Sequence, residues 1–320
     1  MRRLRAGLAA ALIVAAAAAT AAEKYPPVSV QVTPIRVSER AWYVQGLQGA
    51  ASAANEAYNS NAGFVVTDEG VVVVDALGTP SLGNELLKAI RRITPKPVRR
   101  VIVTHYHADH FYGLQAFKDA GAEVWAHRGS LDYLTGGEGQ RRYEQRVQVL
   151  APWVNAKSRL VHADRWLDGD ETFTLGGVRF EVQHFGPAHS PEDLVVVVPQ
   201  EGVVFSGDIL FKGRLPFVGA ADSKAWLARI GRLIDLKPRL MVTGHGEVSS
   251  DPAADLALTR DYLTDLRREM GRAVADFVPF EEAYAKTDWS RYAELPAFAE
   301  ANRVNAYGTY LLMERESLAK

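Results

Sequence analysis

The stretch Val101-Ile102-Val103-Thr104-His105-Tyr106-His107-Ala108-Asp109-His110 decides how the rest of the chain is interpreted. A short apolar run, typical of a buried strand, leads directly into three histidines and one aspartate within six residues. In an extended segment the side chains of residues i and i+2 point the same way, so His105 and His107 are placed to hold one ion together. A helix expected after them brings Asp109 and His110 toward a second ion, about 3.5–4 Å away. The motif therefore predicts a dinuclear metal site at a strand end.

Three more residues of metal-binding type lie downstream, each beside small residues at the end of an apolar stretch. They are His189 in Gly186-Pro187-Ala188-His189, Asp208 in Ser206-Gly207-Asp208, and His245 in Gly244-His245-Gly246. Each residue alone would be weak evidence, since an isolated histidine is more often structural and a Gly-Asp pair is usually a turn. Because small neighbours let the backbone approach an ion closely, the repeated setting predicts that all three join the same site.

Strand and helix signals alternate along most of the chain. Valines alternate with polar residues over 28–32, which predicts a half-buried strand, and the apolar runs at 64–66 and 71–74 flank an Asp/Gly turn, which predicts a hairpin. Helices are expected at 82–93, from the histidine motif to about residue 120, and over most of the chain after residue 252. These signals indicate an α/β or α+β sandwich, and periodicity alone does not choose between the two.

The motifs between about residues 60 and 250 resemble those of the metallo-β-lactamase superfamily, because five separated elements occur in the order found in that family. The resemblance implies a four-layer αβ/βα sandwich with the metal ions at one edge. The expected organisation is a signal peptide over residues 1–22, a metallo-β-lactamase-type domain over 28–250, and a helical C-terminal extension over 251–320.

The resemblance also implies the ligand set. The residues implied for the first metal are His105, His107 and His189; those for the second are Asp109, His110 and His245; and Asp208 bridges the two ions. Zinc is the expected metal, with two ions per chain, and iron or manganese is the alternative. Two divalent ions lower the pKa of a bound water to near neutrality, which provides hydroxide as the nucleophile. Asp109 would in addition orient that water or relay its proton.

Four further residues are candidates for supporting roles. Asp75 resembles the family's aspartate that orients a metal-binding histidine, although it also suits a plain turn at a strand end. Lys212 and Arg214 resemble basic positions of glyoxalase II that hold an anionic substrate group, and the alternative is that they are solvated loop charges. Tyr106 lies within the histidine motif and is expected either to line the pocket for substrate or to pack in the core.

The resemblance favours a hydrolase of esters, thioesters or lactones, similar to glyoxalase II and to periplasmic zinc metallohydrolases associated with sulfur oxidation and quinoprotein systems. One alternative is a β-lactamase, but the best-known subclass has a cysteine where Asp208 stands, and this chain contains no cysteine. A second alternative is a persulfide dioxygenase-like oxidoreductase with one iron at positions matching His105, His189 and Asp208.

The N-terminus and the overall charge bear on location and partners. Arginines 2, 3 and 5, an alanine-rich apolar run and Ala19-Thr20-Ala21 fit a cleaved signal peptide, which predicts a periplasmic or secreted bacterial protein; an uncleaved membrane anchor is the alternative. A net charge of −1 gives no basic excess that would favour nucleic acid. The expected partner is a small-molecule substrate, with no nucleic acid and no stable membrane insertion after cleavage.

Overall fold

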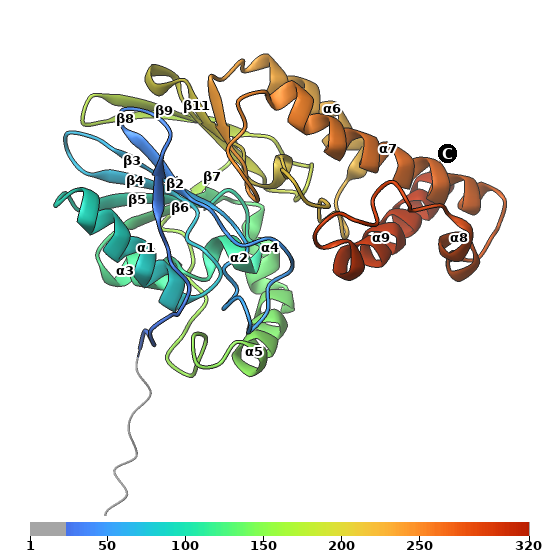
Figure 1. The fold of residues 1–320 in the computed structure, drawn as a ribbon, viewed down its shortest axis with the longest axis horizontal. Helices are drawn as coiled ribbons and strands as arrows, with labels where there is room; N and C mark the ends of the chain where they lie inside the picture. Colours follow the sequence, from blue (N-terminus) through green and yellow to red (C-terminus); the bar gives the residue numbers. More distant parts are fainter. Residues whose placement is uncertain (1–23, 320) are drawn as a thin grey trace, which may run out of the picture.

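The computed structural model describes residues 24–319 and contains two β-sheets packed face to face, with helices on their outer sides (Figure 1). The signal peptide expected over residues 1–22 lies outside the described residues. Within residues 24–319, no helix combines the length and the hydropathy needed to cross a membrane.

The first sheet has seven strands in chain order. They are β1 (Pro34–Arg36), β2 (Ala41–Val44), β3 (Ala62–Val66), β4 (Val71–Val74), β5 (Val98–Ile102), β6 (Glu123–His127) and β7 (Arg165–Leu167). The strands from β1 to β4 pair antiparallel, and β3 and β4 form the predicted hairpin. The strands from β4 to β7 pair parallel, so their carboxyl ends lie at one edge of the sheet.

The second sheet has five strands. In spatial order they are β12 (Leu240–Val242), β11 (Val203–Phe205), β10 (Leu194–Val198), β9 (Val178–His184) and β8 (Glu171–Leu175). Only the β11–β12 pair is parallel, which places the carboxyl ends of these two strands side by side.

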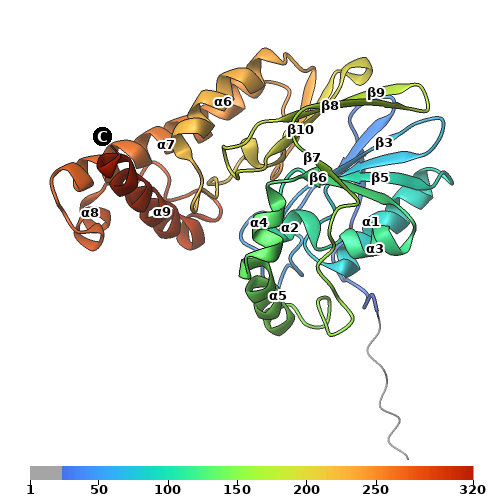
Figure 2. The same ribbon diagram turned by 180° about the vertical axis from the view of Figure 1, so that it is seen from behind.

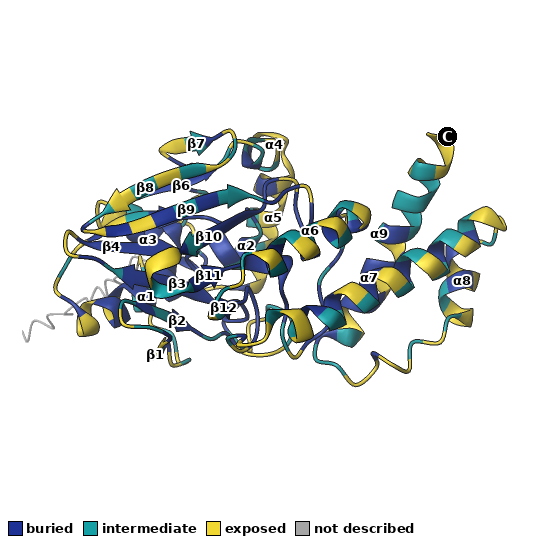
Figure 3. Cartoon of the chain, turned by 90° about the horizontal axis from the view of Figure 1, so that it is seen from above, coloured by how far each residue is buried: buried dark blue, intermediate teal, exposed yellow. Residues whose placement is uncertain are grey.

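Apolar side chains fill the space between the sheets. Val72 and Trp125 of the first sheet belong to one buried cluster with Phe180, Val196 and Phe205 of the second. Figure 3 shows the same distribution, with β4, β10 and β11 almost wholly buried. This cluster is the interior of the sandwich.

Helices cover the outer face of each sheet and complete four layers. Those associated with the first sheet are α1 (Pro80–Ile93), α2 (Ala108–Phe111), α3 (Leu114–Asp119), α4 (Ser130–Thr135) and α5 (Glu138–Val149). Those that pack with the second sheet are α6 (Ser223–Asp235), α7 (Pro252–Ala275), α8 (Phe280–Lys286) and α9 (Phe298–Leu318). The predicted αβ/βα sandwich with a helical C-terminal extension is confirmed.

The C-terminal helices project beyond the sandwich but share its outer core. Figures 1 and 2 show α7, α8 and α9 to one side of the sheets. Tyr262 and Leu263 of α7 belong to the same buried cluster as Trp226 of α6 and Val195 of β10. The extension is therefore packed continuously onto the second sheet.

Two local predictions are wrong. No strand forms at residues 28–32: Val32 is buried against the core, but the backbone N–H of Ser29 donates to the carboxylate of Glu56 rather than to a neighbouring strand. The helix expected up to residue 120 is broken between α2 and α3, because the Gly113 N–H donates to Leu77 O. A Cβ at Gly113 would lie 1.8 Å from Ala76 O, so only glycine fits this approach.

Asn305 of α9 provides a test of how the extension is attached. Its side chain is fully buried and accepts hydrogen bonds from Val218 N and Gly219 N while donating to Pro216 O. The substitution Asn305→Leu would leave these backbone groups without partners, and we expect it to lower the free energy of unfolding by about 3 kcal/mol. Denaturant unfolding would measure this. The control Val304→Ala, on the exposed side of the same helix, should change it by less than about 0.5 kcal/mol, and an equal effect of both would contradict the attachment.

Candidate metal centre

The candidate ligands lie just beyond the carboxyl ends of strands from both sheets. Asp75 follows β4 and His105 follows β5, while Asp208 follows β11 and His245 follows β12. His189 comes from the loop between β9 and β10. Because both pairs of strands are parallel, their ends converge and the side chains meet at one edge of the sandwich.

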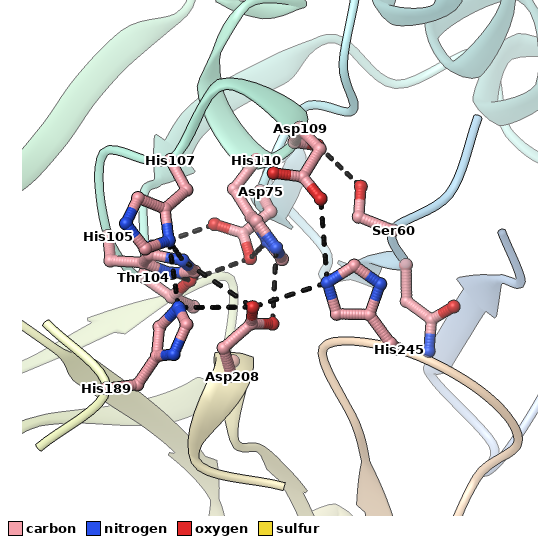
Figure 4. A network of polar contacts seen from close by, with 12 residues as sticks. Ser60, Asp75, Thr104, His105, His107, Asp109, His110, His189, Asp208 and His245 are labelled. Atoms are coloured by element: carbon pink, nitrogen blue, oxygen red, sulfur yellow. Dashed lines mark hydrogen bonds and ion pairs between the residues drawn. The ribbon is translucent and has the colours of Figure 1, made fainter. Parts of the chain in front are cut away.

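The first group contains three histidines and one aspartate whose ligand-type atoms lie within 4.8 Å of one another (Figure 4). His107 Nδ1 is 3.1 Å from His105 Nε2 and 2.8 Å from His189 Nε2. Asp208 Oδ2 is 3.3 Å from His189 Nε2. Imidazole nitrogens converge here on one point, together with a carboxylate oxygen.

The second group contains Asp109, His110 and His245. His245 Nε2 is 3.5 Å from Asp109 Oδ2. Asp208 also faces this group, since its Oδ1 is 3.2 Å from His110 Nε2 and its Oδ2 is 3.3 Å from His245 Nε2. The carboxylate of Asp208 thus lies between the two groups, and the groups have the membership that the family resemblance implies.

Hydrogen bonds at the far ring nitrogen fix which nitrogen of His189 and of His245 faces the cluster. Nδ1 of His189 is 3.0 Å from Phe217 O, and Nδ1 of His245 is 2.5 Å from Asn59 O. A carbonyl only accepts, so each Nδ1 carries the proton. The Nε2 atoms consequently point into the cluster as lone pairs.

Burial keeps the first-group histidines neutral. Burial is the largest cause that lowers the pKa of His105 well below its ordinary value, and burial likewise lowers the pKa of His189 to about 3. Neutral imidazole is the form that coordinates a metal ion.

Asp208 and His110 show an opposite electrostatic pattern. Burial by itself raises the pKa of Asp208, but the surrounding histidines, led by His245 and His110, outweigh it and hold that pKa well below the ordinary value. Burial lowers the pKa of His110, yet the carboxylates of Asp208, Asp75 and Asp109 raise it well above the ordinary value. His110 Nε2 and Asp208 Oδ1 are both buried without a well-directed hydrogen bond. The carboxylates at this point attract positive charge, and a divalent cation would supply it.

Asp75 connects the two ligand groups through hydrogen bonds to the sides of the rings that face away from the cluster. Its Oδ2 is 2.9 Å from His110 Nδ1 and accepts a hydrogen bond from Thr104 Oγ1 at 2.8 Å. Thr104 Oγ1 is in turn 3.0 Å from His105 Nδ1. Asp75 has a φ of 63°, a left-handed conformation that is uncommon outside glycine. This carboxylate therefore orients one ring of each group, which a plain turn residue would not do.

Glycines allow the strand ends to approach so closely. A Cβ at Gly244 would lie 1.9 Å from Asp208 Oδ1 and 2.8 Å from the backbone of Gly207. No larger residue fits between these two segments, which explains the small residues noted beside Asp208 and His245.

Two residues in the loop before β3 contribute to the site and are not among the residues predicted from the sequence. Asn59 Nδ2 donates to Asp109 Oδ2 at 2.8 Å, and Asn59 O accepts from His245. The hydroxyl of Ser60 donates to Asp109 O. The run Asn59-Ser60-Asn61 directly before an apolar strand is the signal in the sequence that could have found them.

The three residues expected to bind substrate lie in different settings. Arg214 is only 4% exposed, and its Nη1 is 3.2 Å from His245 Nδ1 and donates to Gly49 O. Lys212 points away from the cluster and pairs with Asp255 at 2.9 Å. Tyr106 lines the pocket, but its hydroxyl donates to Val161 O and its ring packs against Phe111. Only Arg214 brings a polar group next to the cluster.

The cluster opens into a pocket of about 620 Å³. His107, Asp109, His189, Asp208 and His245 form its floor. Its walls come from the loops around residues 50 and 217–222 and from helices α4 and α5. The pocket is large enough to hold a small-molecule substrate above the cluster.

Comparisons with known proteins agree with this geometry. Residues 56–245 match the model of the metallo-beta-lactamase superfamily. A linear primary-alkylsulfatase from Pseudomonas sp. is 25% identical over an alignment of 235 residues that covers 62% of this chain and 44% of that protein. The chain thus spans less than half of the alkylsulfatase. A type 2 metallo-beta-lactamase from Elizabethkingia meningoseptica is 26% identical over 195 residues, covering 59% of this chain and 70% of the relative.

Solved structures show the same fold. A metallo-beta-lactamase from Pontibacter korlensis superposes with a TM-score of 0.58 at 23% identity, covering 73% of this chain and 99% of its own. An inverting sec-alkylsulfatase from Pseudomonas sp. superposes with a TM-score of 0.65 at 20% identity, covering 88% of this chain and 50% of its own. The chain belongs to the metallo-beta-lactamase superfamily, and its buried histidine and aspartate cluster is the candidate metal site of a hydrolase of that superfamily.

Proposed function

We propose that the protein is an exported dinuclear zinc hydrolase that acts on an ester, thioester or lactone. The observation that carries the proposal is the position of Asp208, whose two carboxylate oxygens face histidines of both ligand groups. A carboxylate between two sets of nitrogen donors suits a pair of divalent ions sharing one ligand.

The residues fit two zinc ions by their chemistry. His105, His107 and His189 offer three nitrogens to one ion, while Asp109, His110 and His245 offer one oxygen and two nitrogens to the other. Bound there, the ions would supply a water of lowered pKa and would polarise the carbonyl group of a substrate. Iron and manganese bind the same donor types, so the identity of the metal is part of the proposal.

Asp109 orients the attacking water in this mechanism. Burial raises the pKa of Asp109, but His110 and His245 outweigh it and lower that pKa to about 2, so the side chain is a carboxylate at neutral pH. Asn59 Nδ2 holds its Oδ2 at 2.8 Å. Held in this way, the carboxylate accepts a hydrogen bond from water at the pocket floor and fixes its direction.

Arg214 is proposed to bind an oxygen of the substrate. Its guanidinium is buried, lines the pocket and has an Nε without a hydrogen-bond partner among the described residues. A buried cation with an unsatisfied donor stabilises negative charge that develops on a neighbouring oxygen. Lys212 is held by Asp255 and has no such role in the proposal.

Two other substrate classes should be assayed, because the names of two relatives refer to them. The type 2 metallo-beta-lactamase and the alkylsulfatase act, by name, on β-lactams and on alkyl sulfates. Asp208 favours ester-type substrates, because the best-known β-lactamase subclass has a cysteine at this position. A single-iron oxidoreductase is disfavoured because the second group of three ligands would then have no ion to hold.

Export and partners complete the proposal. The N-terminal pattern of arginines, apolar run and small residues supports a signal peptide and a periplasmic or secreted location. A pocket of about 620 Å³ above the cluster supports a small-molecule partner, and the net charge of −1 gives no support to nucleic acid.

Metal content is the first test. We expect the mature protein, purified without added metal, to contain about two zinc ions per chain by elemental mass spectrometry. It should hydrolyse esters, thioesters or lactones faster than β-lactams or alkyl sulfates. About one iron per chain, with oxygen consumption on a persulfide, would instead support the oxidoreductase alternative.

The role of Asp109 gives a second test. We expect Asp109→Ala to lower kcat by at least about 100-fold and to weaken the binding of the second zinc ion. The variant lacks both a ligand of that ion and the group that orients water. Asp68→Ala, an exposed carboxylate on the β3–β4 turn, is the control and should keep full activity. Full activity in Asp109→Ala would refute the two-metal mechanism.

Asp75 and Thr104 provide a third test, with zinc affinity as the readout. We expect Asp75→Ala to lower the affinity for both zinc ions by about 10–100-fold, because hydrogen-bond partners of the ligating histidines orient their rings. Thr104→Val should lower only the affinity for the ion held by His105, since it removes the hydroxyl that links Asp75 to His105. Titration against a competing chelator would separate the two ions. Equal effects of both variants on both ions would refute the proposed network.

A further inference from the structure

Helices α4 and α5 form one wall of the pocket, which the loop of residues 217–222 also lines. The chain departs from the first sheet after β6 and returns to it at β7, and residues between them build this wall. Figures 1 and 2 both show α4 and α5 beside α2, the helix that carries Asp109 and His110. α5 buries only Gly139 completely, so most of its side chains stay accessible.

Aromatic contacts fix this wall relative to the metal centre. The ring of Tyr133 in α4 packs edge-on against Phe111 of α2, with centroids 6.0 Å apart. Tyr143 of α5 packs against Tyr112 at 6.3 Å, and its hydroxyl donates to Ser158 O at 2.6 Å. The wall is therefore attached to the segment that bears the ligands, and its polar groups have a defined position across the pocket.

Two arginines of α5 face the pocket without carboxylate partners. Arg142 and Arg146 are one helical turn apart and both line it. Asp132 and Glu138 line the same wall, yet among residues 24–319 no carboxylate oxygen lies within the 4.0 Å of an ion pair from either guanidinium. Arg146 Nε is in addition buried without a hydrogen-bond partner. These donors remain available to a ligand.

Apolar side chains line other parts of the same pocket. Phe217, Val218 and Ala221 line one side of the pocket, and Ala50 and Ala51 contribute further apolar surface. A molecule held in the pocket can thus contact the ligand cluster, apolar side chains and the guanidinium groups of α5.

We propose that Arg142 and Arg146 bind a carboxylate at the end of the substrate remote from the scissile bond. The substrate class is accordingly an ester or thioester with an apolar body and a terminal carboxylate, because the guanidinium fork matches the two oxygens of that group. This proposal rests on the proposed hydrolase function and adds the substrate class. It concerns a wall of the pocket that shares no residue with the metal ligands.

The test compares charged and neutral substrates of the same length on the zinc-loaded protein. The charged set consists of the mono-para-nitrophenyl esters of succinate, adipate and suberate, and the neutral set consists of their methyl esters. We expect the double variant Arg142→Gln/Arg146→Gln to raise KM for the best charged substrate by about tenfold without changing kcat. KM for its neutral counterpart should not change. A rise in KM for both sets, or for neither, would overturn the proposal.

A matched control and a binding measurement keep this test separate from the proposed function. Arg141→Gln removes the same charge from the exposed side of α5, does not touch the pocket, and should leave every KM unchanged. Calorimetric titration with adipate should show about tenfold weaker binding in the double variant than in the wild type or Arg141→Gln. Equal adipate affinity in all three proteins would refute the arginine site. Absence of hydrolysis together with the expected loss of adipate binding would refute the hydrolase proposal alone.

Discussion

The metal centre depends on one buried carboxylate, that of Asp75. It is only 3% exposed and accepts hydrogen bonds from Thr104 N, Thr104 Oγ1 and His110 Nδ1. Through Thr104 it also sets the ring of His105. A single side chain thus fixes one ligand in each group, and this explains why its backbone is held at a φ of 63° in spite of the cost of that conformation.

A buried cluster of this kind dictates the architecture around it. Carboxylates and imidazoles at such density are tolerated in a protein interior only if each polar atom finds a hydrogen bond, an opposite charge or a metal ion. The parallel pairs β4–β5 and β11–β12 bring strand ends together from both sheets, and the backbones of Gly207 and Gly244 permit the remaining approach. The sandwich therefore serves to place short, rigid segments from distant parts of the sequence around one point.

The sequence predicted the parts of the molecule that obey local rules. The fold class follows from the resemblance of the ordered motifs to the metallo-β-lactamase superfamily. His189, Asp208 and His245 are recognisable because each stands at the end of an apolar stretch beside small residues. The failures have a common physical cause. Val28, Val30 and Val32 alternate like a strand because they pack on the core, but whether a partner strand exists is a property of the whole fold. Asn59 could not be assigned for the same reason, since its two contacts lie 50 and 186 residues away.

Candidate substrate-binding residues are harder still to assign from the sequence, because a charge is informative only when its partners are known. Lys212 and Arg214 are two positions apart, yet Asp255 holds one of them while the other is buried beside His245. Their difference depends on a contact with Asp255 of α7, which nothing in the sequence around residue 212 shows.

The C-terminal extension takes part in the metal centre through such a long-range contact. Asn305 of α9 holds Pro216, Val218 and Gly219, and between them the carbonyl of Phe217 accepts the hydrogen bond that orients His189. The same loop lines the pocket, as do α4 and α5. A change in the packing of α9 would thus reach both a ligand ring and the apolar side of the pocket. The extension consequently helps to position a candidate ligand, and the pocket walls come from segments outside the two sheets, while the strand ends place the ligands.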